Sequence, residues 1–85
     1  MRLARHRQFE KEFQKLPMHV KDAFEQRVRL FVENKFYPLL SNHPLGGEYQ
    51  GLRSINVTGD FRALFEDHGE LVIFKRIGTH SELYG

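Results

Sequence analysis

The sequence contains no cysteine among its 85 residues, which removes two classes of small protein from consideration. Neither a disulfide framework nor a thiolate metal site can form. No apolar run approaches the roughly 20 residues needed to span a bilayer, and we expect no signal peptide. We therefore expect a soluble intracellular protein without membrane contact. The chain also lacks repeats and low-complexity tracts, which predicts a single domain over residues 1–85.

The net charge is small, at +2, but it is unevenly distributed. Residues 1–35 carry nine Lys or Arg against five Asp or Glu, a balance of +4. Residues 36–85 carry four against six, a balance of −2. The first half therefore presents a basic surface suited to a polyanion or an acidic protein partner. A simply solvated charged face explains so small an excess equally well, so charge alone identifies no partner.

The first half of the chain has the apolar spacing of two helices. One begins at Arg7 and ends before Pro17, and the second continues to about Asn34. Apolar side chains recur at helical spacing on one face of each helix: Phe9, Phe13, Leu16, Val20, Phe24, Val28 and Phe31. We expect a two-helix hairpin with one continuous apolar face. That face needs a sheet to bury it.

The second half has the alternation and turn signals of that sheet. A loop rich in proline and glycine covers residues 36–49, and loops of this length are commonly functional. Three antiparallel strands follow, joined by tight turns, at residues 52–57, 61–66 and 71–77. A short edge strand is expected within residues 1–6. The predicted fold class is therefore α+β: a short N-terminal strand, a two-helix hairpin and a three-stranded antiparallel sheet.

Residues 78–85 place reactive side chains directly after the last predicted strand. His80 has the side chain that titrates closest to neutral pH, Tyr84 adds a phenol, and Leu83 can anchor the segment to the body. A polar tail that merely caps the sheet is the simpler interpretation of this segment alone. However, the turn at Gly59 and this tail lie at the same end of an antiparallel sheet. We therefore expect the reactive side chains to lie together at one edge of the sheet.

The side chains expected at this edge fit metal-free cleavage of RNA. In that reaction a base takes the proton of a ribose 2′-OH, an acid protonates the departing 5′-oxygen, and a cation stabilises the phosphate. The candidates are His43, Asp60 and His80 for proton transfer, Arg53 and Arg62 for the phosphate, and Phe61 and Tyr84 for base stacking. The three proton carriers could instead bind zinc. We rank metal lower because no HxxxH or HExxH pair is present, and we expect no cofactor.

Three segments carry a resemblance to a known family: HPLGGEYQGLR (residues 43–53), GDF (59–61) and GTHSELYG (78–85). The chain resembles the RelE/ParE toxin superfamily, and within it the YafQ-type mRNA interferases. This resemblance implies a RelE-like fold and a toxin of a bacterial type II toxin–antitoxin pair that acts in the cytoplasm. It also implies metal-independent cleavage of mRNA in the ribosomal A site, and inhibition by an acidic, partly disordered antitoxin.

The resemblance also assigns roles to residues by position. His43, Asp60 and His80 match catalytic residues of the YafQ type, whereas Tyr84 replaces a functional phenylalanine and Phe61 a tryptophan. The one departure is Asn56, which stands where that type has a further histidine. An amide cannot exchange protons near neutral pH, so Asn56 is expected to bind RNA or to orient a neighbour.

Two alternatives remain open at the level of sequence. ParE-type members of the superfamily poison DNA gyrase by binding it, and an inert homologue would bind only its antitoxin. Neither needs clustered proton carriers, so the presence of His43, Asp60 and His80 favours the ribonuclease.

Overall fold

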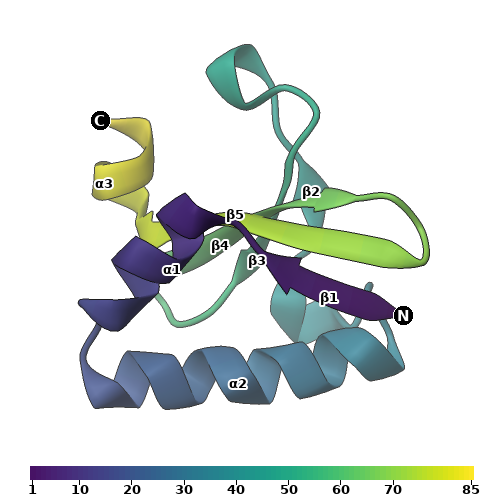
Figure 1. Cartoon of the computed structure of the whole chain (residues 1–85), viewed down its shortest axis with the longest axis horizontal. Coiled ribbons are helices and arrows are strands. Elements are labelled where there is room, and N and C mark those ends of the chain that lie inside the picture. Colours follow the sequence, from purple (N-terminus) through teal and green to yellow (C-terminus); the bar gives the residue numbers. More distant parts are fainter.

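The computed structural model describes residues 1–85 and contains five strands and three α-helices (Figure 1). The elements in chain order are β1 (Arg2–Arg5), α1 (Arg7–Gln14), α2 (Met18–Glu33), β2 (His43–Pro44), β3 (Arg53–Asn56), β4 (Phe61–Asp67), β5 (Leu71–Thr79) and α3 (His80–Tyr84). Two single 3₁₀ turns, η1 (Pro38–Leu40) and η2 (Gly47–Tyr49), interrupt the long loop between α2 and β3.

The sheet has the strand order β1-β5-β4-β3-β2. The predicted antiparallel meander of β3, β4 and β5 is confirmed. The expectation of a three-stranded sheet is wrong, because the sheet has five strands: the predicted N-terminal strand joins one edge, and an unpredicted short strand, β2, joins the other. The N-terminal strand β1 joins β5 in parallel, with Leu3 opposite Val72. In the segment expected to be only a loop, β2 pairs antiparallel with β3, with His43 opposite Ser54.

The two predicted helices form at the expected positions, but they do not make a hairpin. His6 starts α1 by accepting a hydrogen bond from the Gln8 N–H at 3.1 Å, and Pro17 precedes α2. Figure 1 shows α1 rising from the start of α2 instead of lying alongside it. The reason lies at the sheet edge, where the Glu12 carboxylate accepts the N–H of Ile77 in β5 at 3.0 Å. Because β1 has ended by this point, α1 takes over that edge of the sheet.

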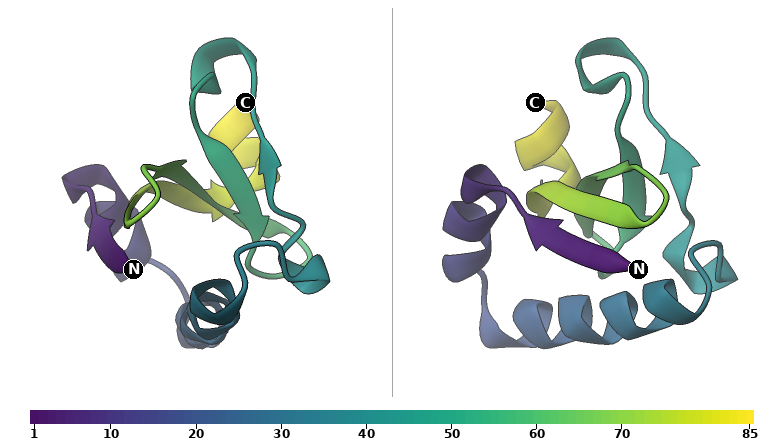
Figure 2. Two further views of the ribbon diagram at one scale, coloured as in Figure 1. Left: turned by 90° about the vertical axis from the view of Figure 1, so that its right-hand side faces the viewer. Right: turned by 45° about the vertical axis from the view of Figure 1, so that its right-hand side comes forward.

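The C-terminal segment is a further difference from the expected fold. The residues predicted as a tail extend β5 to Thr79 and then form the helix α3. The Thr79 hydroxyl accepts the Glu82 N–H at 3.1 Å, and the Glu82 carboxylate accepts the Thr79 N–H at 2.8 Å. This reciprocal cap satisfies two N–H groups at the helix start. Leu83 is 4% exposed, which confirms its predicted role as an anchor. Figure 2 shows α3 and α2 on opposite sides of the sheet.

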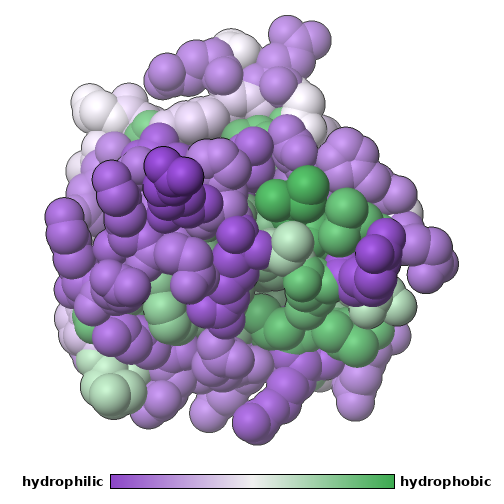
Figure 3. Space-filling view, in the orientation of Figure 1, coloured by the Kyte–Doolittle hydropathy of each residue, from purple (hydrophilic) through white to green (hydrophobic).

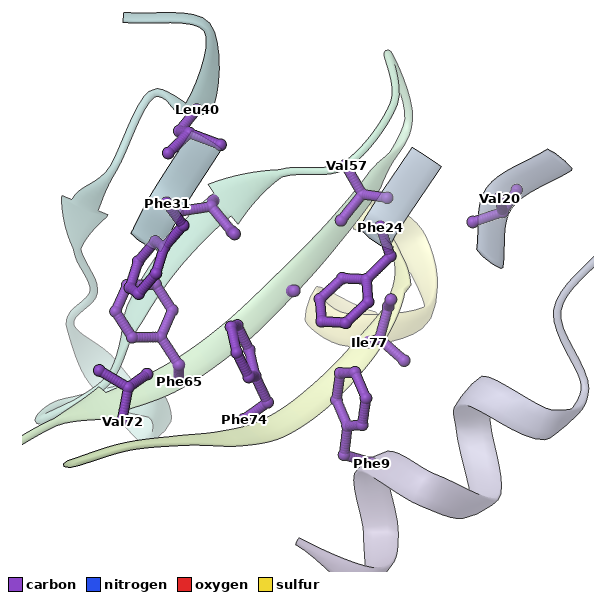
Figure 4. Close-up of a cluster of buried hydrophobic side chains, with 12 residues drawn as sticks. Phe9, Val20, Phe24, Phe31, Leu40, Val57, Phe65, Val72, Phe74 and Ile77 are labelled. Atoms are coloured by element: carbon purple, nitrogen blue, oxygen red, sulfur yellow. The ribbon is translucent and has the colours of Figure 1, made fainter. Parts of the chain in front are cut away.

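An aromatic core fills the space between the sheet and the two longer helices (Figure 4). Phe74 of β5 lies at its centre, with its ring centroid 5.2 Å from that of Phe24 and 5.7 Å from those of Phe9 and Phe65. Several of these pairs are tilted or edge-to-face, which suits the aromatic quadrupole. The core therefore lies on one face of the sheet and leaves the other face available for a site.

The surface is mostly polar. Figure 3 shows hydrophilic side chains over much of one face, with an apolar area over β1 and the adjoining end of β5. Leu3 in β1 is 38% exposed. None of the helices is both long and apolar enough to cross a membrane.

Candidate active site

A polar pocket of about 430 Å³ opens on the sheet face opposite the aromatic core. It is lined by Ser41, His43, Leu45, Ser54, Asn56, Arg62, His80 and Tyr84. Strand alternation explains why these residues meet: in β3, Ile55 enters the core while Ser54 and Asn56 face the other way. The register places Asn56 opposite Arg62 on the neighbouring strand. The pocket is thus built from β2, β3, β4 and α3.

His43 is held in one orientation by the loop before it. Its Nδ1 lies 2.7 Å from the carbonyl oxygen of Ser41. Because a carbonyl only accepts, Nδ1 must carry the proton, and the neutral ring then has its free lone pair on Nε2. Ser41 adopts a left-handed backbone with φ of 51°, which is uncommon for a residue other than glycine. The loop therefore sets both the ring position and the tautomer of His43.

Arg62 is a cation held in place by the turn between β3 and β4. Its Nη1 donates to the carbonyl oxygens of Thr58, Gly59 and Phe61 at 3.1, 3.2 and 3.0 Å. Its Nε and Nη2 make no hydrogen bond within the protein. Those donors remain free for a bidentate interaction with a planar or tetrahedral anion in the pocket.

His80 and Tyr84 reach the pocket from α3. The His80 backbone N–H donates to the carbonyl of Asp60 at 3.1 Å, so the turn and α3 meet at one end of the sheet as predicted. The His80 and Tyr84 ring centroids are 4.7 Å apart. Burial of the phenol raises the pKa of Tyr84 above its usual value, and the nearby Tyr49 acts in the same direction. Tyr84 is therefore a hydrogen-bond donor throughout the physiological pH range.

The pocket contains five of the eight side chains singled out from the sequence: His43, Asn56, Arg62, His80 and Tyr84. Asp60 lies in the exposed turn outside this pocket, and its backbone carbonyl accepts the His80 N–H. Phe61 lines a separate pocket of about 400 Å³ beside α1. Proposed roles for these two residues stay predictions.

Arg53 is the second arginine that the sequence offered for phosphate binding. It lies outside the pocket. Its Nε donates to the Asn42 side chain at 2.8 Å, and its guanidinium lies 5.6 Å from the Phe36 ring centroid. An RNA-binding role for Arg53 stays a prediction.

The sequence interpretation missed other contributors to the pocket. Ser54 is only 1% exposed and forms part of the pocket wall. The alternation of Ser54 and Asn56 with apolar Ile55 and Val57 is a signal from which this polar face could have been found. The contributions of Ser41 and Leu45 depend on the path of the loop, for which the sequence has no comparable signal.

The acidic and imidazole side chains do not converge on a metal-binding arrangement. No group of three or more His, Cys, Asp or Glu side chains is placed to hold a metal ion. The zinc alternative for His43, Asp60 and His80 therefore has no preformed ligand set in this conformation.

Comparison with solved structures identifies the fold. The crystal structure of YafQ from Escherichia coli strain BL21(DE3) matches with a TM-score of 0.85 and 22% identity over 100% of both chains. The E. coli DinJ-YafQ toxin-antitoxin complex matches with a TM-score of 0.80 and 23% identity, over 98% of this chain and 96% of the other. The fold is therefore the one that these bacterial toxins adopt.

Sequence comparison then identifies the family. The chain is 36% identical over 44 residues to the mRNA interferase toxin YafQ of E. coli strain K12. That alignment covers 52% of this chain and 48% of the relative, so it spans about half of the relative's length. The family model described as bacterial toxin of type II toxin-antitoxin system, YafQ, matches residues 1–85. The chain belongs to this family.

Proposed function

We propose that this protein is the toxin of a type II toxin–antitoxin pair and an endoribonuclease that cleaves mRNA without a metal ion. The observation that carries the proposal is that two imidazoles, from His43 and His80, line one pocket together with Arg62. Proton carriers together with a cation are the groups that phosphodiester cleavage by a neighbouring hydroxyl requires. The name of the E. coli relative, mRNA interferase toxin, supports the same reaction.

The two histidines divide the proton transfers. Neutral His43 presents Nε2 as an acceptor, which suits a base that removes the ribose 2′-OH proton. The oxygen so activated attacks the adjacent phosphorus, and the 5′-oxygen of the next nucleotide leaves. His80, in its protonated form, donates the proton that this leaving oxygen needs. The product carries a 2′,3′-cyclic phosphate on one side and a free 5′-hydroxyl on the other.

The other pocket residues bind and orient the RNA. Arg62 stabilises the charge that develops on the phosphoryl oxygens, because its free donors can pair with two of them. Tyr84 offers a protonated phenol and an aromatic face for a base. Asn56 contributes an amide for hydrogen bonding without titrating. Asp60 supports His80 from the turn, through the hydrogen bond between their backbones.

The cellular setting completes the proposal. The substrate is mRNA in the ribosomal A site, in the bacterial cytoplasm, and an antitoxin inhibits the toxin by covering the pocket or distorting it. The solved complex of YafQ with DinJ supports a protein antitoxin as partner. An acidic, partly disordered antitoxin segment would suit the basic residues of the first half of this chain.

Primer extension on mRNA from cells induced for this protein tests the proposal. We expect new 5′ ends within translated messages, and we expect them to vanish when the cognate antitoxin is co-expressed. In a purified assay with RNA alone or with programmed ribosomes, EDTA is expected to leave cleavage of the RNA alone unchanged. Metal-dependent cleavage would reassign His43 and His80 as ligands. Intact mRNA with stabilised gyrase cleavage complexes on supercoiled DNA would replace the ribonuclease with the gyrase alternative.

A further inference from the structure

The helix that carries His80 and Tyr84 depends on the rest of the molecule for its position. α3 has only five residues, and helices of this length are unstable on their own in water. Leu83 is buried and anchors one side of α3 to the body of the protein. A second contact comes from far away in the chain, because the Tyr49 hydroxyl donates to the Leu83 carbonyl at 2.5 Å. This bond satisfies a carbonyl in the last turn, where helical partners run out.

Tyr49 also contacts the aromatic side chain that enters the pocket. Its ring meets Tyr84 edge-to-face, with centroids 5.4 Å apart and planes at 86°. Tyr84 in turn packs against the His80 ring. Tyr49 itself does not line the pocket. It therefore supports from behind the two residues of α3 that face the proposed substrate.

The Tyr49 hydroxyl is fixed from its other side by an ion pair. Arg76 Nη1 donates to this hydroxyl at 3.2 Å, so the hydroxyl accepts one hydrogen bond and donates another. Arg76 is held by Glu12 of α1, with Nε–Oε2 and Nη2–Oε2 distances of 2.9 and 2.8 Å. The hydrogen bond to the Glu12 carboxylate raises the pKa of Arg76 against the opposing effect of burial. A continuous chain of charged and polar contacts thus runs from α1 through Tyr49 to α3.

We propose that Tyr49 is a positioning residue of the active site, which aligns His80 and Tyr84 with the pocket through its hydroxyl and its ring. The Glu12–Arg76 ion pair sets the position of that hydroxyl. The inference rests on the ribonuclease activity proposed above. It adds Tyr49 from the long loop, Glu12 from α1 and Arg76 from β5, none of which lines the pocket.

The activity test compares Tyr49→Phe with Tyr37→Phe, which removes a hydroxyl from an exposed tyrosine in the same loop. The substrate is a labelled mRNA on programmed ribosomes, with the same RNA alone as a second substrate. For Tyr49→Phe we expect kcat to fall by about tenfold to a hundredfold, because small misplacements of reacting groups are costly. We expect KM to change by less than about twofold, because His43 and Arg62 remain in place. Tyr37→Phe is expected to match the parent.

A second measurement does not depend on catalysis. In the RNA-free protein, NMR reports the ring signals of His80 and the hydrogen exchange of the α3 amides. We expect Tyr49→Phe to shift or broaden the His80 signals and to speed exchange in α3, while a thermal melt shows a folded protein. Unchanged His80 signals and unchanged exchange would overturn the proposal, as would a full kcat.

A double variant tests the role of the ion pair. If Glu12 acts through Tyr49, adding Glu12→Gln to Tyr49→Phe changes the His80 signals no further, whereas independent effects would add. Additive changes in the His80 signals would therefore show that Glu12 and Arg76 do not act through Tyr49. If the parent protein cleaves neither substrate, the proposed function fails. The NMR comparison then still decides whether Tyr49 holds α3.

Discussion

At the scale of single residues, His80 is the side chain on which the proposed chemistry depends most. His80→Ala is expected to lower the cleavage rate by about 10²–10⁴-fold, the usual cost of losing a general acid or base. Because His80 is exposed, we expect the free energy of unfolding to change by no more than about 0.5 kcal/mol. His19→Ala, at an exposed position of α2, is the matched control. A variant at His80 that stays as toxic as the parent would exclude it as acid or base.

The structure also ranks the two arginines that the sequence could not separate. Arg62 lines the pocket and Arg53 lies outside it. Arg62→Ala is therefore expected to lower cleavage by about 10²–10³-fold, comparable to removing one donor from an anion site. The cleavage rate of Arg62→Lys is expected to lie between those of the parent and of Arg62→Ala, because a lysine keeps the charge without the planar guanidinium. Single-turnover cleavage by these variants and Arg53→Ala, with a melt of each, gives the comparison. A larger loss for Arg53→Ala would contradict this ranking.

Which residue types line the pocket was therefore easier to predict from the sequence than which strand residues face it. Residue type and the positions of turns were enough to select His43 and His80. The same reasoning could not place Arg53, because the face that a strand residue occupies depends on register. It also missed Tyr49, whose partner Leu83 lies 34 positions later. A contact of that kind leaves no local pattern.

At the scale of elements, α3 is sensitive to its junction with β5. A Cβ added at Gly78 would lie 3.2 Å from the Glu82 Oε1 that caps the helix, and 3.5 Å from Leu83. Gly78→Ala is expected to displace this cap, lowering stability by about 1 kcal/mol, or about 4–8 °C in Tm, together with activity. Gly46→Ala is the control, because a Cβ there meets nothing within 4 Å. An unchanged melting temperature and unchanged cleavage for Gly78→Ala would show that α3 accommodates the added Cβ without losing its cap.

The elements that the sequence predicted are those with a strong local pattern. α1, α2 and the meander have apolar periodicity or turn residues within each segment. β2 has only two residues and includes a proline, so only its pairing with β3 makes it a strand. α3 has one turn, and its capping box at Thr79 and Glu82 is the local signal that was overlooked.

At the scale of the whole molecule, carboxylates that link distant elements make stability depend on pH. Burial alone would raise the pKa of Glu12, but hydrogen bonds from Arg76 and the Ile77 N–H outweigh it and lower the pKa below the ordinary 4.5. When the pKa of a carboxyl is lower in the folded state than in the unfolded state, the carboxyl stabilises the fold at pH values above its unfolded-state pKa. That contribution is lost as the pH falls through its folded-state pKa. The pKa of Asp67, which forms an ion pair with Lys35, is also lowered.

Urea denaturation between about pH 6 and about pH 3 measures this dependence. We expect the free energy of unfolding to fall once the pH drops below about 4.5. Glu12→Gln is expected to be less stable at pH 6 and to show a shallower decline. Exposed Glu10, changed to Gln, is the control. A decline as steep in Glu12→Gln as in the parent would show that other carboxylates govern acid unfolding.

The parallel pairing of β1 with β5 has a consequence for synthesis on the ribosome. Within the sheet, β1 has β5 as its sole neighbour, and β5 is the strand farthest from it in the sequence. This pairing is between segments far apart in the sequence, so β1 of a nascent chain stays unpaired until residues 71–74 have left the ribosome. The histidine and tyrosine of α3 emerge later still. The proposed active site can therefore assemble only after nearly all of residues 1–85 have been translated, so we expect an incomplete chain to lack the proposed activity.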